Sequence, residues 1–244
     1  PMNKILVPVD FSESAADALR YALELNRRFF AKIILLYVFD MPKISGGEVL
    51  PELELNYKNF AKGFEDDLEL FFKKYSNPDE PWIYEVHAIA GEHNESIVHF
   101  AEQEDADLIV LGRKGVAGLR RLIFGSVSKY VLTHATMPVI VVPAGEAYKG
   151  IDKILLATDF NEELSEKNYQ FLSGFTNMFD ARLEILHVVN GEVFRNEKSE
   201  SVFRFLQLQF HKNPHLIKVR GNEDVIGAIE KFSAENNISL LVTI

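Results

Sequence analysis

The amino-acid sequence contains an internal repeat with a period of about 149 residues. The clearest matching segments are MNKILVPVDF at 2–11 with IDKILLATDF at 151–160, and AKIILLYV at 31–38 with ARLEILHV at 181–188. A chain that repeats a segment of this length is expected to fold as two units of one architecture. We therefore expect one unit at 1–145 and a second at 151–244, joined by a short hinge.

The second copy is shorter than the first. Its middle part, around 190–219, is reduced, and Thr243 and Ile244 fall where the first copy has Leu111 and Gly112. The helix and strand that follow Gly112 in the first copy, about 30 residues, have no counterpart in the repeat. We therefore expect the second unit to be incomplete at its C-terminal end.

Short apolar runs alternate with amphipathic segments in the first copy. The segments expected to form strands are 4–9, 33–38, 82–90, 108–111 and 139–142, and all of them except 82–90 are apolar runs typical of strands buried on both faces. Ser12 is suited to cap the helix that follows the first run. Such alternation requires right-handed crossovers, so we expect a Rossmann-like, doubly wound α/β fold with a parallel five-stranded sheet, duplicated in tandem. Ligands of such sheets bind at the carboxyl ends of the strands, where Asp10, Val38 and Gly112 lie.

A glycine-rich, basic stretch follows the fourth run. The chain has a net charge of −10, yet it contains no Asp or Glu between Leu108 and Gly145. The basic residues in that stretch are Arg113, Lys114, Arg120, Arg121 and Lys129. Ser126, preceded by Gly125, is expected to begin a helix, whose free backbone N–H groups favour an anion. The pattern suggests a phosphate-bearing ligand. The alternative is that the glycines form turns and the basic residues form a solvated surface.

The spacing of these glycines is specific. Gly112, Gly115, Gly125 and Ser126 form the pattern G-x2-G-x9-G-S, which is followed by Val127 and later by MPVIVV at 137–142. This pattern resembles the ATP-binding signature of the universal stress protein family. The resemblance implies a Rossmann-like domain that binds ATP or no nucleotide and that dimerises through its last strand.

The resemblance also implies roles for individual residues. Asp10 corresponds to the residue that contacts adenine or ribose, and Pro8, Val9 and Val38 correspond to walls of the adenine pocket. The phosphate-binding loop corresponds to Gly112, Gly115, Gly125, Ser126 and Val127, and Mg²⁺ is expected to enter with the nucleotide. Two alternatives remain open: Asp10 as a turn or helix-capping residue, and Val38 as an ordinary core residue.

The second copy departs from the signature. Ala157 and Thr158 stand where the first copy has Pro8 and Val9, although Asp159 is kept. Ile244 occupies the position of Gly112, where a branched side chain would crowd the ribose. We therefore expect the second unit to bind no nucleotide.

Composition excludes several classes of protein. The chain has no cysteine, so disulfides and thiolate metal sites are absent. It contains no apolar run near the roughly 18 residues of a membrane span, and no signal peptide, so we expect a cytoplasmic protein with no membrane association. Its acidic balance argues against nucleic-acid binding.

Three functions are compatible with these features. The first is an ATP-binding regulatory module of the stress response, with slow or absent hydrolysis. The second is an enzyme, a slow ATP hydrolase or nucleotidyl transferase that uses the same crevice, although the sequence reveals no Walker lysine motif and no catalytic residues. The third is a nucleotide-free scaffold. The apolar strand Val139–Val142 would serve as an edge for a homodimer, or for a pseudo-dimer within one chain.

Overall fold

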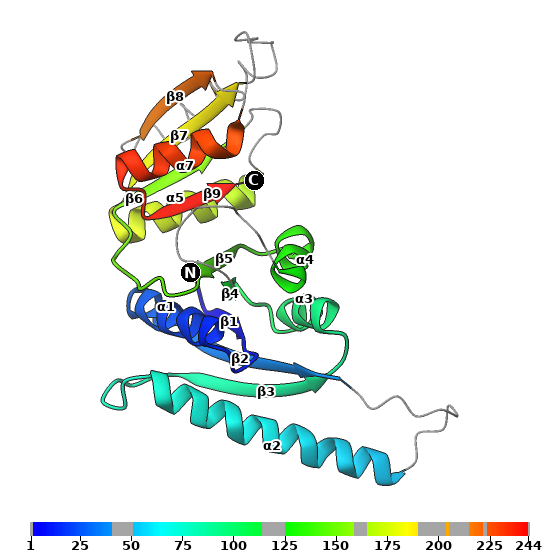
Figure 1. Cartoon of the computed structure of the whole chain (residues 1–244). Coiled ribbons are helices and arrows are strands. Elements are labelled where there is room, and N and C mark those ends of the chain that lie inside the picture. Colours follow the sequence, from blue (N-terminus) through cyan, green and yellow to red (C-terminus); the bar gives the residue numbers. More distant parts are fainter. Residues whose placement is uncertain are drawn as a thin grey trace. The chain divides into compact units, whose positions relative to one another are not determined.

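The computed structural model describes residues 2–40, 51–113, 125–158, 165–189, 204, 215–221 and 224–243 (Figure 1). The chain divides into two compact units, Pro1–Tyr148 and Lys149–Ile244. No helix within the described ranges is long and apolar enough to cross a membrane.

The first unit is built on one parallel sheet of five strands. These are β1 (Lys4–Pro8), β2 (Lys32–Phe39), β3 (Tyr84–Ala90), β4 (Leu108–Arg113) and β5 (Val139–Pro143). Their order in the sheet is β3-β2-β1-β4-β5, and every neighbouring pair is parallel. The predicted Rossmann-like fold is therefore confirmed. Since the strands are parallel, their carboxyl ends meet at one edge of the sheet and their amino ends at the other.

Four helices cover the two faces of this sheet. They are α1 (Glu13–Phe29), α2 (Pro51–Tyr75), α3 (His93–Gln103) and α4 (Ser126–His134). Side chains alternate between the faces along each strand. Leu36 and Ile109 belong to a buried cluster with residues of α3 and α4, whereas Tyr37 and Phe39 pack on aromatic residues of α2. The helices thus lie in pairs, α1 and α2 on one face and α3 and α4 on the other.

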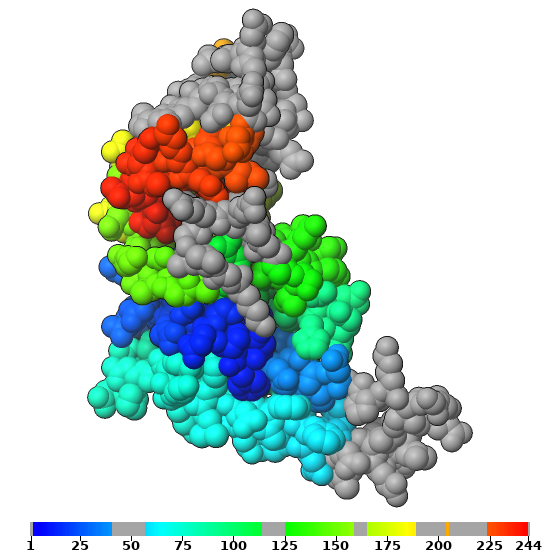
Figure 2. All heavy atoms as spheres, in the orientation of Figure 1, coloured from blue at the N-terminus to red at the C-terminus, as the bar shows by residue number. Residues whose placement is uncertain are grey.

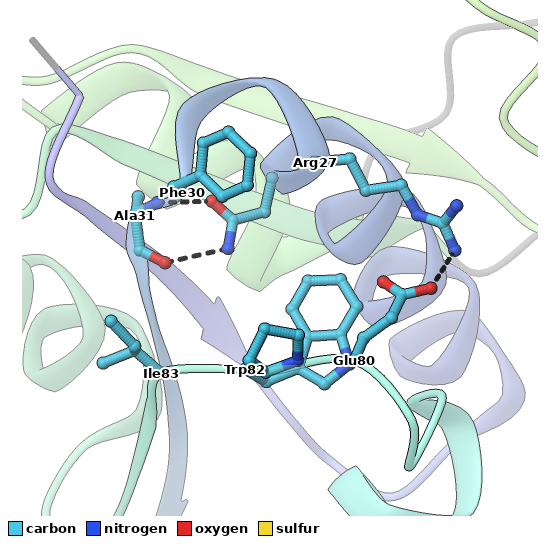
Figure 3. Close-up of a pocket in the computed structure, with 8 residues that line it drawn as sticks. Arg27, Phe30, Ala31, Glu80, Trp82 and Ile83 are labelled. Carbon is cyan, nitrogen blue, oxygen red and sulfur yellow. Dashed lines mark hydrogen bonds and ion pairs between the residues drawn. The ribbon is translucent and has the colours of Figure 1, made fainter.

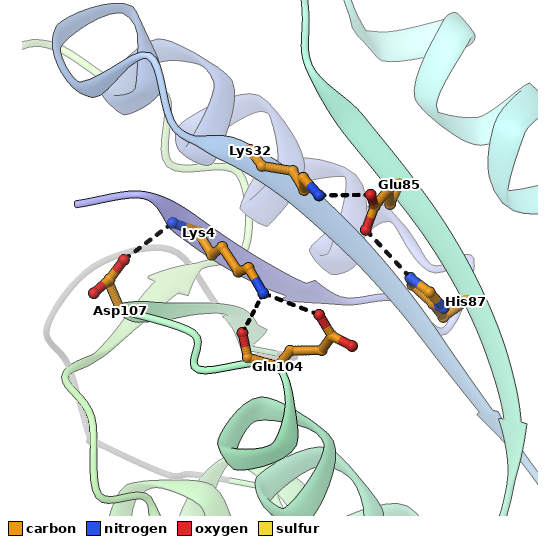
Figure 4. A network of polar contacts seen from close by, with 6 residues as sticks. All are labelled: Lys4, Lys32, Glu85, His87, Glu104 and Asp107. Carbon is orange, nitrogen blue, oxygen red and sulfur yellow. Dashed lines mark hydrogen bonds and ion pairs between the residues drawn. The ribbon is translucent and has the colours of Figure 1, made fainter.

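Polar contacts join the amino ends of the strands (Figure 4). The Lys4 ammonium donates to the Glu104 carboxylate at 3.1 Å, and the Lys4 backbone N–H donates to Asp107 at 3.1 Å, which connects β1 to the loop before β4. The Lys32 ammonium donates to Glu85 at 2.6 Å and connects β2 to β3. The lysine–carboxylate pairs are partly exposed, so each adds little stability by itself.

The second unit repeats most of this arrangement. Its elements are β6 (Lys153–Ala157), α5 (Glu166–Phe179), β7 (Arg182–Val189), β8 (His215–Gly221), α7 (Val225–Asn236) and β9 (Leu240–Thr243). The sheet order β8-β7-β6-β9 matches β3-β2-β1-β4, so the tandem duplication of the fold is confirmed. The sequence did not predict β8, because the reduced middle of this copy has no apolar run that matches the first copy.

Candidate functional site

The predicted site residues come together at the carboxyl edge of the first sheet. β1 ends at Pro8, just before Val9 and Asp10, while Val38 and Gly112 are the next-to-last residues of β2 and β4. Helix α4 begins at Ser126, as the sequence predicted. Gly115 lies outside the described residues, so its predicted role stays a prediction.

The loop between β1 and α1 is a tight polar turn. The Val9 N–H donates to Leu36 O at 2.8 Å and continues the hydrogen bonding of the sheet. Asp10 Oδ1 accepts from the Ser12 N–H at 3.1 Å and also from the Ser12 hydroxyl. Phe11 between them has a φ of 60°, a left-handed conformation that is uncommon for an aromatic residue. Asp10 therefore acts as a turn residue in this structure, which is one of the two roles that the sequence left open.

Ser12 caps helix α1, as predicted. Its Oγ accepts from the Ala15 N–H at 3.3 Å and lies 2.9 Å from the Ser14 hydroxyl. Asp10, Ser12 and Ser14 thus form a chain of polar groups at the N-terminus of α1. Ser14 was not predicted from the sequence, although serine is a residue type that often caps helices and Ser14 follows Ser12 by two positions.

The packing of β4 against α1 requires glycine at position 112. A Cβ at this position would lie within 3.0 Å of three backbone atoms of α1, namely O and C of Ser14 and N of Ala15. A real side chain does not tolerate such contacts with a backbone. Gly112 therefore allows β4 to pack directly against the first turn of α1, a requirement that exists without any ligand.

The N-terminus of α4 is open. Gly125 is its N-cap, with φ of −64° and no side-chain capping hydrogen bond, and a Cβ built on Gly125 meets nothing within 4 Å. Inside the helix, Lys129 N is the donor to Gly125 O, so the preceding N–H groups of Ser126 and Val127 have no intrahelical acceptor. Gly125 and Ser126 are exposed. Such a helix N-terminus can hold an anion.

Two buried side chains complete this edge. Val38 belongs to the buried cluster that also contains Ile97 and Leu111, so in this structure it acts as a core residue. Arg113, the last residue of β4, is buried, and it places a positive charge at the carboxyl end of the strand. The sequence drew attention to Arg113 only as one of several basic residues. In the parts of the chain that the structure describes, no cluster of His, Asp or Glu could hold a metal ion.

At the corresponding edge of the second unit, the backbone hydrogen bonding is the same as in the first unit and the side chains differ. The Thr158 N–H donates to Leu186 O at 3.0 Å, as Val9 does to Leu36. Ala157 pairs with Thr243 at the end of the sheet, which aligns Ile244 with Gly112. Asp159 and Ile244 themselves lie outside the described residues.

Comparisons with known proteins identify the family. The model of the universal stress protein family matches residues 2–143, more than half of the chain. A universal stress protein of Methanocaldococcus jannaschii is 33% identical over 142 residues, which covers 57% of this chain and 81% of that protein. A solved universal stress protein from Archaeoglobus fulgidus has a TM-score of 0.72 at 18% identity and covers 99% of this chain and 86% of its own, which shows a shared fold. The chain therefore belongs to the universal stress protein family.

Proposed function

We propose that the chain is an ATP-binding regulatory module of the stress response, with one nucleotide site in its first unit. The observation that carries the proposal is the open N-terminus of α4 at the carboxyl edge of the sheet. A phosphate group suits this position for three reasons: backbone N–H groups lack helical acceptors, the Ser126 hydroxyl is exposed, and there is free space at Gly125. The surrounding sequence from Leu108 to Gly145 has no carboxylate to repel it.

The remaining roles follow from the positions of the residues. Gly125, Ser126 and Val127 would bind the phosphates, and Gly115 would lie in the same loop. Asp10 would contact the ribose or adenine, since a carboxylate can accept from hydroxyl or amine groups while it also holds the turn. Pro8, Val9 and Val38 would support the base. Mg²⁺ would enter with ATP and be held mainly by phosphate oxygens and water.

We assign no nucleotide site to the second unit, 151–244. The position that corresponds to Gly112 carries Ile244, and Ala157 and Thr158 stand where the first unit has Pro8 and Val9. In this proposal the second unit is a degenerate domain of the same family that contributes packing. A nucleotide-free scaffold that dimerises through β5 is the second candidate. It is favoured by the edge position and half-buried side chains of β5.

Calorimetric titration of the purified chain, stripped of nucleotide, with ATP and Mg²⁺ tests the proposal. We expect one ATP per chain. Gly125→Val should abolish ATP binding and keep the fold. A Cβ at this position contacts no other part of the protein, and the added side chain would occupy the space proposed for phosphate. Gly63→Val in α2 is the matched control, since a Cβ there also meets nothing within 4 Å, and it should bind ATP normally.

Two results would change the conclusion. If the folded chain binds no ATP, the scaffold function replaces the proposed one. If ATP binds with phosphate release that Asp10→Ala or Ser126→Ala removes, the protein is an enzyme that uses this crevice.

A further inference from the structure

A pocket of about 140 Å³ lies at the amino edge of the first sheet, opposite the candidate nucleotide site (Figure 3). Its walls come from the end of α1, the start of β2 and the loop before β3. The polar side chains that line it are bonded within the chain. Arg27 pairs with Glu80 at 2.6 Å, Asn26 binds the N–H and C=O of Ala31, and the Trp82 indole N–H donates to a backbone oxygen at 3.1 Å. The pocket therefore offers little to recognise a polar ligand.

Asn94, in the first turn of α3 at the carboxyl edge, is different. Its side-chain oxygen Oδ1 is buried and has no hydrogen-bond partner among the residues that the structure describes, although the residue as a whole is only half-buried. A buried acceptor without a donor costs free energy, so such groups are rare in folded proteins. Helix capping does not explain this side chain, because the Glu92 carboxylate binds the backbone N–H of Asn94, at 2.8 Å. The described contacts thus give the carboxamide no structural role.

The start of α3 lies beside the end of β2. The Gly91 N–H donates to Phe39 O at 3.1 Å, and His93 Nδ1 lies 3.7 Å from Asp40 Oδ1. Phe39 and Asp40 directly follow Val38 in the chain, and Val38 is a wall of the base pocket in the proposed function. The first turn of α3 is therefore next to the position proposed for the base.

Asn94 belongs to the face of α3 that is turned toward the sheet. Ile97 and Val98, three and four residues later, share this face and belong to the same buried cluster as Val38. Helix α3 packs on both β2 and α4, and in the space-filling view it lies at the surface between them (Figure 2). The Asn94 side chain is thus on the same side of the sheet as the N-terminus of α4.

The charges along this edge favour one orientation of a nucleotide. The stretch from Leu108 to Gly145, which includes α4, has no Asp or Glu, whereas Asp40 and Glu92 lie at the start of α3. Carboxylates repel phosphates but tolerate a neutral base. A nucleotide whose phosphates bind at the N-terminus of α4 would therefore direct its base toward α3.

We propose that Asn94 recognises the N6 and N7 edge of the base and so selects adenine over other purines, an inference that rests on the proposed ATP site. The Asn94 carboxamide accepts from the N6 amine and donates to N7, the pairing by which asparagine recognises adenine in DNA. The last side-chain torsion of asparagine is broad, so a rotation brings the buried oxygen to a ligand amine. Hypoxanthine and guanine carry an acceptor oxygen in place of this amine, so they can form only one of the two bonds.

Calorimetric titration of the whole chain with ATP and with ITP, each with Mg²⁺, tests this role. ITP has the same ribose and triphosphate as ATP and carries hypoxanthine in place of adenine. We expect ATP to bind at least about tenfold more tightly than ITP, and Asn94→Leu to lower the affinity for ATP to that for ITP. The fold should survive this substitution, because leucine has a similar size and the Glu92 cap uses only the backbone of residue 94.

Asn168→Leu is the matched control. Asn168 is an exposed asparagine in the first turn of α5, its backbone N–H is likewise bound by the capping side chain, and its replacement should leave the preference for ATP unchanged. Equal affinities of the natural protein for ATP and ITP, or an unchanged preference in Asn94→Leu, would overturn the role of Asn94 and leave the ATP site in place. A folded chain that binds neither nucleotide would instead refute the proposed function, and this role with it.

Discussion

Replacing Gly112 by alanine tests whether this glycine serves the fold. The added Cβ would lie within 3.0 Å of three backbone atoms in the first turn of α1. No rotamer change can relieve such a contact, because both partners are backbone. Strand β4 and helix α1 must therefore move apart, by a distance on the order of 1 Å if normal van der Waals separation is to be restored.

The expected cost is large. Helix α1 is deeply packed, and its residues Ala15, Ala18 and Leu19 are buried. Overpacking of a well-packed interior costs about 1–3 kcal/mol, and more when the neighbour cannot rearrange. We expect Gly112→Ala to lower the free energy of unfolding of the first unit by about 3 kcal/mol, which corresponds to a fall of roughly 1.5 M in the urea midpoint for a slope near 2 kcal/mol/M.

Urea unfolding followed by tryptophan fluorescence measures this effect. Trp82 is the single tryptophan of the chain and lies in the first unit, so the signal reports that unit alone. Gly125→Ala is the matched control. Its Cβ meets nothing within 4 Å and its φ of −64° suits any residue, so its cost should stay within about 1 kcal/mol. Equal midpoints for Gly112→Ala and the natural protein would refute the assignment of Gly112 to helix–strand packing.

Two further substitutions test the energetics of the two units. Glu184→Ile should stabilise the second unit by about 1–3 kcal/mol, because the Glu184 carboxylate is buried and its Oε2 has no hydrogen-bond partner among the described residues, while its Oε1 makes only a long contact of 3.9 Å with the exposed Arg182. Slower hydrogen exchange of the β7 amides would show the gain, and unchanged exchange would contradict it. The hydrogen bond from Lys32 lowers the pKa of Glu85, so Lys32→Met should cost up to about 1 kcal/mol at neutral pH. This difference should vanish as the pH falls through the lowered pKa of Glu85, since the stabilisation exists only while that carboxylate is charged; a constant difference in acid unfolding titrations would exclude the mechanism.

Local sequence signals predicted the framework of the first unit. Apolar runs located four of the five strands, and 82–90 was also expected to be a strand. The Ser12 cap and the start of α4 at Ser126 appeared where residue type and spacing placed them. These features depend on residues close together in the chain, so the sequence is sufficient to find them.

Features that depend on distant parts of the chain were not predictable in this way. The need for glycine at position 112 arises from Ser14, almost one hundred residues earlier, and the sequence suggested a ligand instead. The left-handed Phe11 and Phe30 have none of the glycine or asparagine signals that usually mark such positions. The pocket around Trp82 was hidden because its walls come from α1, β2 and the loop before β3.

The two units show which parts of the sequence the shared fold depends on. Ala106 N donates to Ala101 O in the first unit, and Ile238 N donates to Ser233 O at the same point of the second. Ser233 therefore occupies the position of Ala101. Glu184 occupies the position of Ile34, because the two pair with the equivalent residues Leu155 and Leu6. Ile34 and Ala101 belong to the apolar core of the first unit, whereas Glu184 and Ser233 are buried and each has a polar atom without a hydrogen-bond partner among the described residues.

Backbone pairing therefore tolerates polar residues in the core of the second unit, whereas position 112 of the first unit, where a Cβ would meet the backbone of α1, tolerates no side chain. A sheet register depends on backbone groups that every residue except proline provides in full. A phosphate site depends on the absence of side chains at a few defined positions. A copy of the fold can accordingly keep its sheet without a phosphate site, which is why the proposed function has one nucleotide per chain and not two.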